Sequence, residues 1–325
     1  MPSNSDRPLR AMRRPARLLV VTALLLATTS FPTLAQQATI QTGDTKMTTR
    51  SATLKVPGAT LYYEETGTGP TLLIIPGGPQ DAGVFAPLAA ELAGRFHVVA
   101  YDPRGNSRSR FDGEATPLDV DQQADDAAAL IAHVGGPAYV FGTSGGAQIG
   151  LNLAARHPQL VTALVAHEPP SMMLLDDPEP MLAADRALYE TYKTEGVDAA
   201  MAQFFAEAGL DDGAAPEGDI PDFDPANMPP EAAETFMRVS GNFEYWLAHG
   251  MLPLSTYTPD VAALTAGAPR VIVAIGEQSA GQPIHAMSMA LANALDVAPA
   301  SMPGDHMGFE TQPAEFAQSL EAAFK

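Results

Sequence analysis

The 325-residue chain contains no cysteine, only one tryptophan and few basic side chains. Without cysteine it has no disulfide, no thiolate nucleophile and no cysteine metal site. It also lacks a His-Glu-x-x-His or paired-histidine spacing, so we predict neither a metal nor a cofactor. Lys and Arg number 18 against 38 Asp and Glu, which gives a net charge of −20. Such a charge repels phosphate backbones and anionic membrane surfaces, and it argues against nucleic acid as a partner.

The first 35 residues have the pattern of a secretory signal peptide. Five arginines precede an apolar run from Leu18 to Ala27, and small residues precede a cleavage point expected after Ala35. The run is short for a membrane span, and an uncleaved signal anchor is the alternative. We therefore predict export to the periplasm or secretion, a flexible leader over residues 36–50 and no stable membrane insertion. Cleavage would leave 13 basic and 37 acidic side chains, a net charge of −24.

Strand-like and helical segments alternate over two parts of the chain, residues 51–169 and 257–325. Continuous apolar runs such as 71–75 and 97–101 are typical of buried parallel strands, and helical patterns lie between them. The alternation stops over residues 170–256, where helical stretches such as Glu231–Ala248 take its place. It resumes near the end of the chain, where the last strand is expected at Val297–Met302. The pattern predicts an α/β core with a mostly parallel sheet flanked by helices, interrupted by a helical insertion.

One short motif predicts a nucleophile. Residues 142–146 (Gly-Thr-Ser-Gly-Gly) follow an apolar run and precede a stretch of small residues, with the Gly-x-Ser-x-Gly spacing of a nucleophile elbow. A sharp strand-to-helix turn exposes the serine hydroxyl, and tiny neighbours let the strand and the helix cross at close range. Ser144 is therefore the candidate nucleophile.

Three further motifs in matching order make the chain resemble the α/β-hydrolase fold superfamily. Residues 76–79 (Pro-Gly-Gly-Pro) are similar to its oxyanion-hole turn, and residues 303–309 are similar to its histidine loop. Residues 102–109 are similar to the turn after its fourth strand, where we expect Asp102 and Arg104 to brace the loop as a pair. The resemblance covers residues 51–169 and 257–325. It implies a serine hydrolase whose α-helical lid, residues 170–256, is inserted after strand six.

The resemblance also implies roles for individual residues. His306 would take the proton from Ser144 and return it to the leaving group. The backbone N–H groups of Gly78 and Gly145 would stabilise the negative oxygen that forms on the substrate. Pro79 has no N–H and cannot serve in place of Gly78.

The catalytic acid departs from the family's common pattern, because Ser279 stands where the acid usually does. Glu168 directly follows the strand 160–166, whose end lies beside the elbow in a doubly wound sheet. Residues 167–170 (His-Glu-Pro-Pro) are also similar to a stretch in zearalenone-type lactonases, which carry the acid there. We favour Glu168. A shifted Glu277, or a site with no acid at all, remains the alternative.

The helical insertion is expected to form the ceiling of the substrate pocket. Its segment 171–234 holds 16 acidic and 2 basic side chains, which disfavours anionic substrates. Large apolar residues are expected to face inward as substrate contacts, with plain packing of the insertion as the alternative: Phe205, Phe243, Tyr245, Trp246 and Met251. We expect a small, neutral, largely apolar ester or lactone as substrate.

The sequence thus predicts an exported serine hydrolase that cleaves carboxylic esters or lactones through an acyl-enzyme on Ser144. Two alternatives stay open. Residues 76–79 and 102–105 also resemble proline iminopeptidases, which makes an aminopeptidase or amidase one of them. The absence of an acid at Ser279 leaves a catalytically inactive binding protein as the other. The sequence assigns no oligomeric state.

Overall fold

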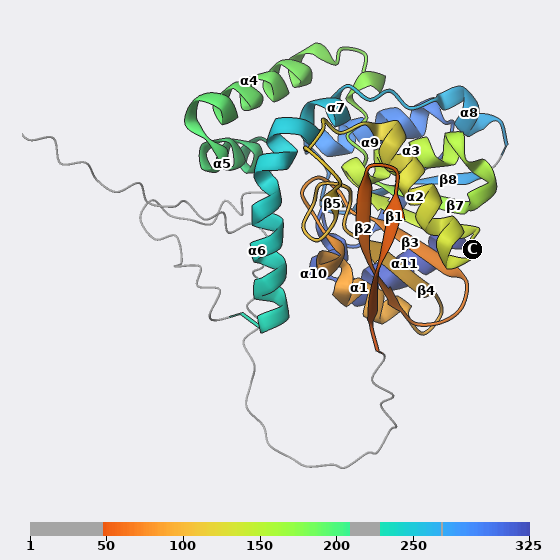
Figure 1. Ribbon diagram of the computed structural model, residues 1–325. Helices are drawn as coiled ribbons and strands as arrows, with labels where there is room; N and C mark the ends of the chain where they lie inside the picture. The colour runs from red at the N-terminus through yellow and green to blue at the C-terminus, as the bar shows by residue number, and fades with distance from the viewer. Residues whose placement is uncertain (1–47, 209–227, 268) are drawn as a thin grey trace, which may run out of the picture.

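The computed structural model describes residues 48–208, 228–267 and 269–325 (Figure 1). The predicted signal peptide and nearly all of the predicted leader lie outside these ranges. None of the helices in the described ranges is both long and apolar enough to cross a membrane. The sequence-based prediction of an α/β architecture is confirmed by the elements that follow.

The described residues form one sheet of nine strands in the order β1-β2-β4-β3-β6-β7-β8-β9, with β5 beside β2. The strands from β4 onward along this order are parallel, while β1, β2 and β5 pair antiparallel. The central strands are buried on both faces, which explains why their sequences are continuous apolar runs. Their bounds are β1 Arg50–Val56, β2 Ala59–Thr66, β3 Thr71–Ile75, β4 His97–Tyr101, β5 Arg110–Phe111, β6 Ala138–Thr143, β7 Val161–His167, β8 Arg270–Gly276 and β9 Ala300–Met302.

Helices cover both faces of the sheet (Figure 1). On one face α1 and α11 pack together, and their apolar side chains join one core cluster. On the other face α2, α3 and α9 contribute to a second cluster. The bounds of the core helices are η1 Ala82–Phe85, α1 Ala86–Leu92, α2 Val120–Val134, α3 Gly145–Arg156, η2 Pro158–Leu160, α8 Val261–Thr265, α9 Pro283–Ala294, α10 Gly308–Thr311 and α11 Pro313–Phe324.

The chain between β7 and β8 is helical where the structure describes it. In Figure 1, α4 and α5 form a hairpin that projects beyond the sheet, and α6 runs down one side of the core. A single π-helical turn, η5, joins α6 to α7. The bounds are η3 Met172–Leu174, α4 Glu179–Glu195, α5 Val197–Ala208, α6 Pro230–Tyr245, η5 Trp246–Gly250 and α7 Met251–Ser255. We call this part of the chain, residues 170–256, the helical insertion.

Two elements differ from the sequence-based prediction. The last strand begins at Ala300 and not at Val297, because Asp296 adopts a left-handed conformation and the Val297 amide donates back to the carbonyl of Ala292. This turn is the C-cap of α9. Val297, which the composition of the segment assigns to the strand, is therefore part of the end of the helix. The long helix expected at Glu231–Ala248 ends at Tyr245, where the backbone changes to the π-helical turn.

Candidate active site

Ser144 occupies a strained turn between β6 and α3. Its φ of 53° lies in the left-handed region, which non-glycine residues rarely adopt. A Cβ on Gly142 would lie 2.5 Å from the carbonyl oxygen of Gly146, and one on Gly146 would lie 2.2 Å from that of Ile75. The strand and the helix therefore cross too closely for any side chain at these two positions. The turn has the geometry expected of a nucleophile elbow.

Glu168 and His306 form a direct pair. The His306 Nδ1 atom lies 2.7 Å from Glu168 Oε2. The other carboxylate oxygen, Oε1, accepts a hydrogen bond of 2.9 Å from the backbone N–H of Gly276. Because a carboxylate accepts at Nδ1, that nitrogen carries a proton, which leaves Nε2 as the ring nitrogen that can act on a substrate or a hydroxyl. His306 is thus oriented as a base.

The end of β7 positions Glu168. Ser144 donates its N–H to the carbonyl of His167, and Glu168 donates its own to the carbonyl of Ala274. Glu168 is wedged between the elbow and β8 with a φ of 45°, and its side chain is fully buried. Burial alone would raise its pKa, but the hydrogen bond to His306 and the fields of His167 and His306 lower the pKa to about 2. The carboxylate therefore stays ionised at neutral pH.

The other candidates for the acid lie in different surroundings. Ser279 is completely buried beside Glu168, where its hydroxyl helps to lower the pKa of that carboxyl group, although it forms no well-aligned hydrogen bond. Glu277 is exposed and accepts from Ser301 Oγ at 3.1 Å. Asp305 accepts from the backbone of Met307 in its own loop. Of these groups, only Glu168 is hydrogen-bonded to His306.

His167 is the second histidine of the site. Its ring lies nearly parallel to that of His306, with centroids 6.1 Å apart, and its Nδ1 is 3.0 Å from the Thr143 hydroxyl. It is completely buried and its Nε2 has no partner. Burial lowers the pKa of His167 to about 4. It is therefore neutral at pH 7 and adds no positive charge behind the Glu168–His306 pair.

The backbone amides of Gly78 and Gly145 lie side by side. A Cβ built on Gly145 would be 3.5 Å from the Gly78 nitrogen, and one on Gly77 would be 2.8 Å from Ser144 Cβ. Gly145 is also the first residue of α3, whose free N–H groups carry the positive end of the helix dipole. The two amides are thus placed next to the serine, as an oxyanion hole requires.

The turn that carries Gly78 is held by side chains from two other segments. Asn106 Nδ2 donates to the carbonyls of Gly78 and Gln80 at 3.1 and 3.0 Å. Asn242, from α6 of the helical insertion, donates to the carbonyl of Pro79 at 2.8 Å and accepts from the Ser107 amide at 2.7 Å. The insertion therefore takes part in shaping the oxyanion turn. The sequence analysis did not identify either asparagine.

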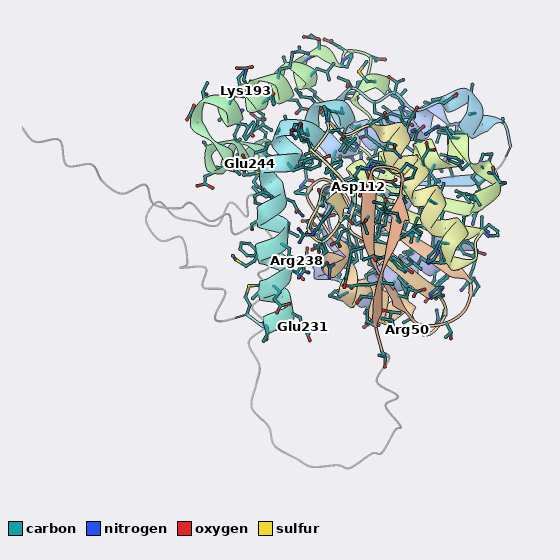
Figure 2. All side chains as sticks on the ribbon, viewed as in Figure 1. Arg50, Asp112, Lys193, Glu231, Arg238 and Glu244 are labelled. Carbon is teal, nitrogen blue, oxygen red and sulfur yellow. The ribbon has the colours of Figure 1, made fainter. Side chains whose placement is uncertain are left out.

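A buried ion pair adds to this connection. Arg238 Nε lies 2.7 Å from Oδ2 of Asp81, whose side chain is fully buried just after the turn. Figure 2 shows Arg238 part-way along α6, on the side of the helix that faces the core. Removal of Arg238 would leave the buried carboxylate of Asp81 without its ion-pair partner, which is strongly destabilising.

Asp102 and Arg104 brace their loop, but they do not pair with each other. Asp102 binds Arg108 through both carboxylate oxygens, at 2.8 Å each. Arg104 instead forms a bidentate pair with Asp126 of α2. The expected direct pair is therefore wrong. Two separate ion pairs do the bracing: Asp102 pairs within its own turn with Arg108, and Arg104 pairs with Asp126 on α2.

Ser144, His306, Gly78 and Gly145 line one cavity of about 270 Å³. Most of its wall comes from the helical insertion and is apolar. Phe205, Phe243, Trp246 and Met251 contribute to it, as the sequence predicts. The wall also contains side chains that the sequence analysis did not name, among them Met172, Met181, Met201, Met287, Met307, Asp185, Glu207 and Ser255. Flexible methionines adapt to ligands of different shape.

Tyr245 is a correction to the predicted pocket residues, because it does not line this cavity. Its ring packs against Gly105 and Phe111, and its hydroxyl donates to the carbonyl of Thr116. Phe243 and Trp246 are three residues apart and share one face of the helix, whereas Tyr245 lies on another face. Composition alone does not distinguish these faces near the change to the π-helical turn.

The fold and this arrangement define a hydrolase of the α/β class. The family model described as alpha/beta hydrolase fold matches residues 70–208. The chain is 31% identical over 279 residues to the uncharacterised hydrolase YraK of Bacillus subtilis, which covers 84% of this chain and 96% of that protein. The chain belongs to the α/β-hydrolase fold family, which confirms the resemblance noted in the sequence.

Two other similarities agree with this assignment. The 2-(acetamidomethylene)succinate hydrolase of Mesorhizobium japonicum is 38% identical over 108 residues, 33% of this chain and 38% of that protein. A thermophilic esterase from Thermogutta terrifontis superimposes with a TM-score of 0.62 at 22% identity, covering 85% of this chain and 97% of the esterase. The esterase likeness bears on the fold alone.

Proposed function

We propose that the protein is an exported serine hydrolase that cleaves carboxylic esters or lactones through an acyl-enzyme on Ser144. The observation that carries the proposal is the 2.7 Å hydrogen bond between Glu168 and His306, on the wall of the same cavity as Ser144. A nucleophile, an oriented base and a buried carboxylate are the three parts of a serine triad.

In the proposed reaction, His306 Nε2 removes the proton from the Ser144 hydroxyl as its oxygen attacks the substrate carbonyl. The amides of Gly78 and Gly145 donate to the oxygen that becomes negative. Glu168 stabilises the imidazolium that forms, and His306 then gives its proton to the leaving alcohol. Water attacks the acyl-enzyme by the same steps in reverse order, which releases the acid and restores Ser144. In a lactone, the alcohol and the acid remain one molecule.

The cavity supports a substrate with an apolar body. Aromatic and methionine side chains dominate its wall, and no Lys or Arg is among the described residues that line it. Trp246 is 7% exposed and its indole N–H has no hydrogen-bond partner. The position of a Cβ on Gly78 is 3.5 Å from that nitrogen, so the free N–H lies next to the proposed oxyanion hole. We propose that it donates to a substrate oxygen.

A fluorophosphonate probe and a panel of p-nitrophenyl esters and lactones test this function. We expect covalent labelling at Ser144, hydrolysis of at least one class, and loss of both in Ser144→Ala. A folded wild-type protein that neither reacts with the probe nor hydrolyses the panel would instead favour the inactive binding protein. Export is tested separately, by N-terminal sequencing of the protein from the periplasm or medium, with cleavage expected near Ala35.

A further inference from the structure

The wall of the cavity carries two carboxyl groups that the proposed chemistry does not use, Asp185 and Glu207. Asp185, on α4, lines the cavity together with Ser255 of α7, and the Ser255 hydroxyl is hydrogen-bonded to Asp185 Oδ2. The neighbour of Ser255 in sequence, Leu254, lies against Gly145: a Cβ there would be 2.7 Å from Leu254 Cδ1. Ser255, which binds Asp185, thus directly follows the residue that lies against Gly145.

Asp185 has too few hydrogen-bond donors for a carboxylate in an apolar wall. The Ser255 hydroxyl has a single hydrogen, yet both Asp185 and the Met251 carbonyl, at 2.9 Å, lie within its reach. Among the charged side chains the structure describes, none of opposite sign pairs with Asp185, and the adjacent Arg186 binds Glu179. A carboxyl group in this position needs a cation or a proton.

The charge around Asp185 adds to this need. Burial raises the pKa of Asp185, the hydrogen bond from Ser255 opposes this, and Glu207 on α5 raises the pKa further. Glu207 also borders the cavity. The cavity therefore has a negative potential on the side of the insertion, while its remaining wall is apolar. The unpartnered N–H of Trp246, in the same cavity, is an independent sign that a ligand with polar atoms belongs there.

We propose that Asp185 binds a protonated amine of the substrate, so that the preferred esters carry an ammonium group within a few bonds of the reacting carbonyl. A cation is favoured over a neutral hydroxyl because it gains from the fields of both Asp185 and Glu207 as well as from the hydrogen bond. This inference rests on the proposed ester hydrolysis at Ser144. The expected substrate therefore has a positive charge at one end, where the sequence analysis expected a neutral molecule. The rest of the substrate is still expected to be apolar.

Binding without turnover tests the inference even if no ester is hydrolysed. Hexylammonium and hexan-1-ol are compared by calorimetry on Ser144→Ala and on Ser144→Ala/Asp185→Asn. We expect hexylammonium to bind the first protein roughly tenfold or more tighter than hexanol, as a charged hydrogen bond predicts, and to lose that preference in the second. Equal binding of the two compounds by Ser144→Ala would overturn the inference.

Turnover gives the second test. Two series of esters are used, one with the amine in the acyl part and one with it in the alcohol part. The chain that carries the amine has three to six carbons, and each ammonium ester is compared with its alkyl isostere. Wild type should show a higher kcat/KM for the ammonium ester in at least one series, and Asp185→Asn should abolish that ratio. Asp185→Glu, which keeps the charge, should restore part of it. Hydrolysis of alkyl esters that depends on Ser144, with no ammonium preference, would overturn this inference and leave the proposed function standing.

The chain offers a matched control for charge. Glu190 lies on the same helix, α4, but is exposed and binds Lys193, which Figure 2 shows on the outer part of the insertion. Glu190→Gln removes one negative charge without changing the cavity. The ammonium preference should persist in this variant. If it fell as far as in Asp185→Asn, the preference would come from net charge and not from a binding site, and the proposal would be wrong.

Discussion

His306 Nδ1 lies 2.7 Å from Oε2 of Glu168, although the two residues are 138 positions apart in the chain. Glu168 directly follows β7, and His306 lies in the loop between β9 and α10. The loop after β8, which usually supplies the acid in the family, contributes only Ser279. Five predictions follow from this pair and the surrounding contacts.

Glu168→Gln should lower kcat roughly 10³-fold or more, because an amide can neither hold the required tautomer of His306 nor stabilise its charged form. Ser279→Ala should change kcat by less than about threefold, since its hydroxyl makes no well-aligned hydrogen bond. Steady-state kinetics on the best ester of the panel measure both. Near-normal turnover of Glu168→Gln would remove the assignment. Partial recovery in Glu168→Gln/Ser279→Asp would show that either strand end can supply the acid.

His167 should make the protein less stable in mild acid. Its pKa is about 4 in the folded protein, below the ordinary value of 6.5. The unfolded chain therefore binds a proton at His167 more readily than the folded protein does. The contribution of the neutral ring to the free energy of unfolding is complete above pH 6.5 and is lost as the pH falls toward 4. The shift corresponds to about 3 kcal/mol. Urea unfolding at pH 7, 6, 5 and 4 should show this loss in wild type and a smaller loss in His167→Asn. Parallel pH profiles for the two proteins would contradict the prediction.

Asn242→Leu should reduce kcat more than it changes KM. The substitution removes the hydrogen bonds to the Pro79 carbonyl and the Ser107 amide, so the turn that carries the Gly78 amide loses its support from α6. We expect a roughly tenfold loss in kcat and a loss of about 2 kcal/mol in the free energy of unfolding. Glu244→Gln, on the exposed side of the same helix (Figure 2), is the control and should behave like wild type. An unchanged kcat in a destabilised Asn242→Leu would mean that the contact supports only the fold.

Trp246→Phe should separate stability from activity. The indole N–H is buried without a partner, so its removal costs the folded protein no hydrogen bond. Packing on Phe204, at 4.8 Å between ring centroids, is largely kept. We therefore expect an unchanged melting temperature together with a roughly tenfold lower kcat/KM, from the lost hydrogen bond to the substrate. A proportional loss of both would indicate plain packing.

The single tryptophan provides a direct measurement of ligand binding. Because Trp246 lines the cavity, its fluorescence should change when a substrate analogue binds to Ser144→Ala. Tyr245→Phe retains this signal and should bind the analogue as wild type does, since Tyr245 lies outside the cavity. A weakened affinity in Tyr245→Phe would contradict the position of Tyr245 outside the cavity.

The amino-acid sequence was enough to predict the α/β class and the motifs around Ser144, Gly78 and His306. These depend on short-range rules: apolar runs mark buried strands, and a tight strand-to-helix turn needs very small residues at fixed spacing. Such constraints act between neighbours in the chain, so they are visible in the order of the residues. The preference for Glu168 had another source: the doubly wound sheet that the family resemblance implies, and the similarity of residues 167–170 to a stretch of zearalenone-type lactonases.

Contacts between side chains of different segments became clear only from the three-dimensional structure. The pairing of Glu168 with His306, the contact of Asn242 with the oxyanion turn and the position of Asp185 each join residues distant in sequence. The same is true of the pair between Arg104 and Asp126 and of the contact of Tyr245 with Thr116. These outcomes depend on how the insertion packs on the core and on one π-helical turn that shifts the helix faces. Packing of this kind depends on how the shapes of two surfaces fit together, and these surfaces come from segments distant in the chain. The spacing of residues within one segment therefore does not predict it.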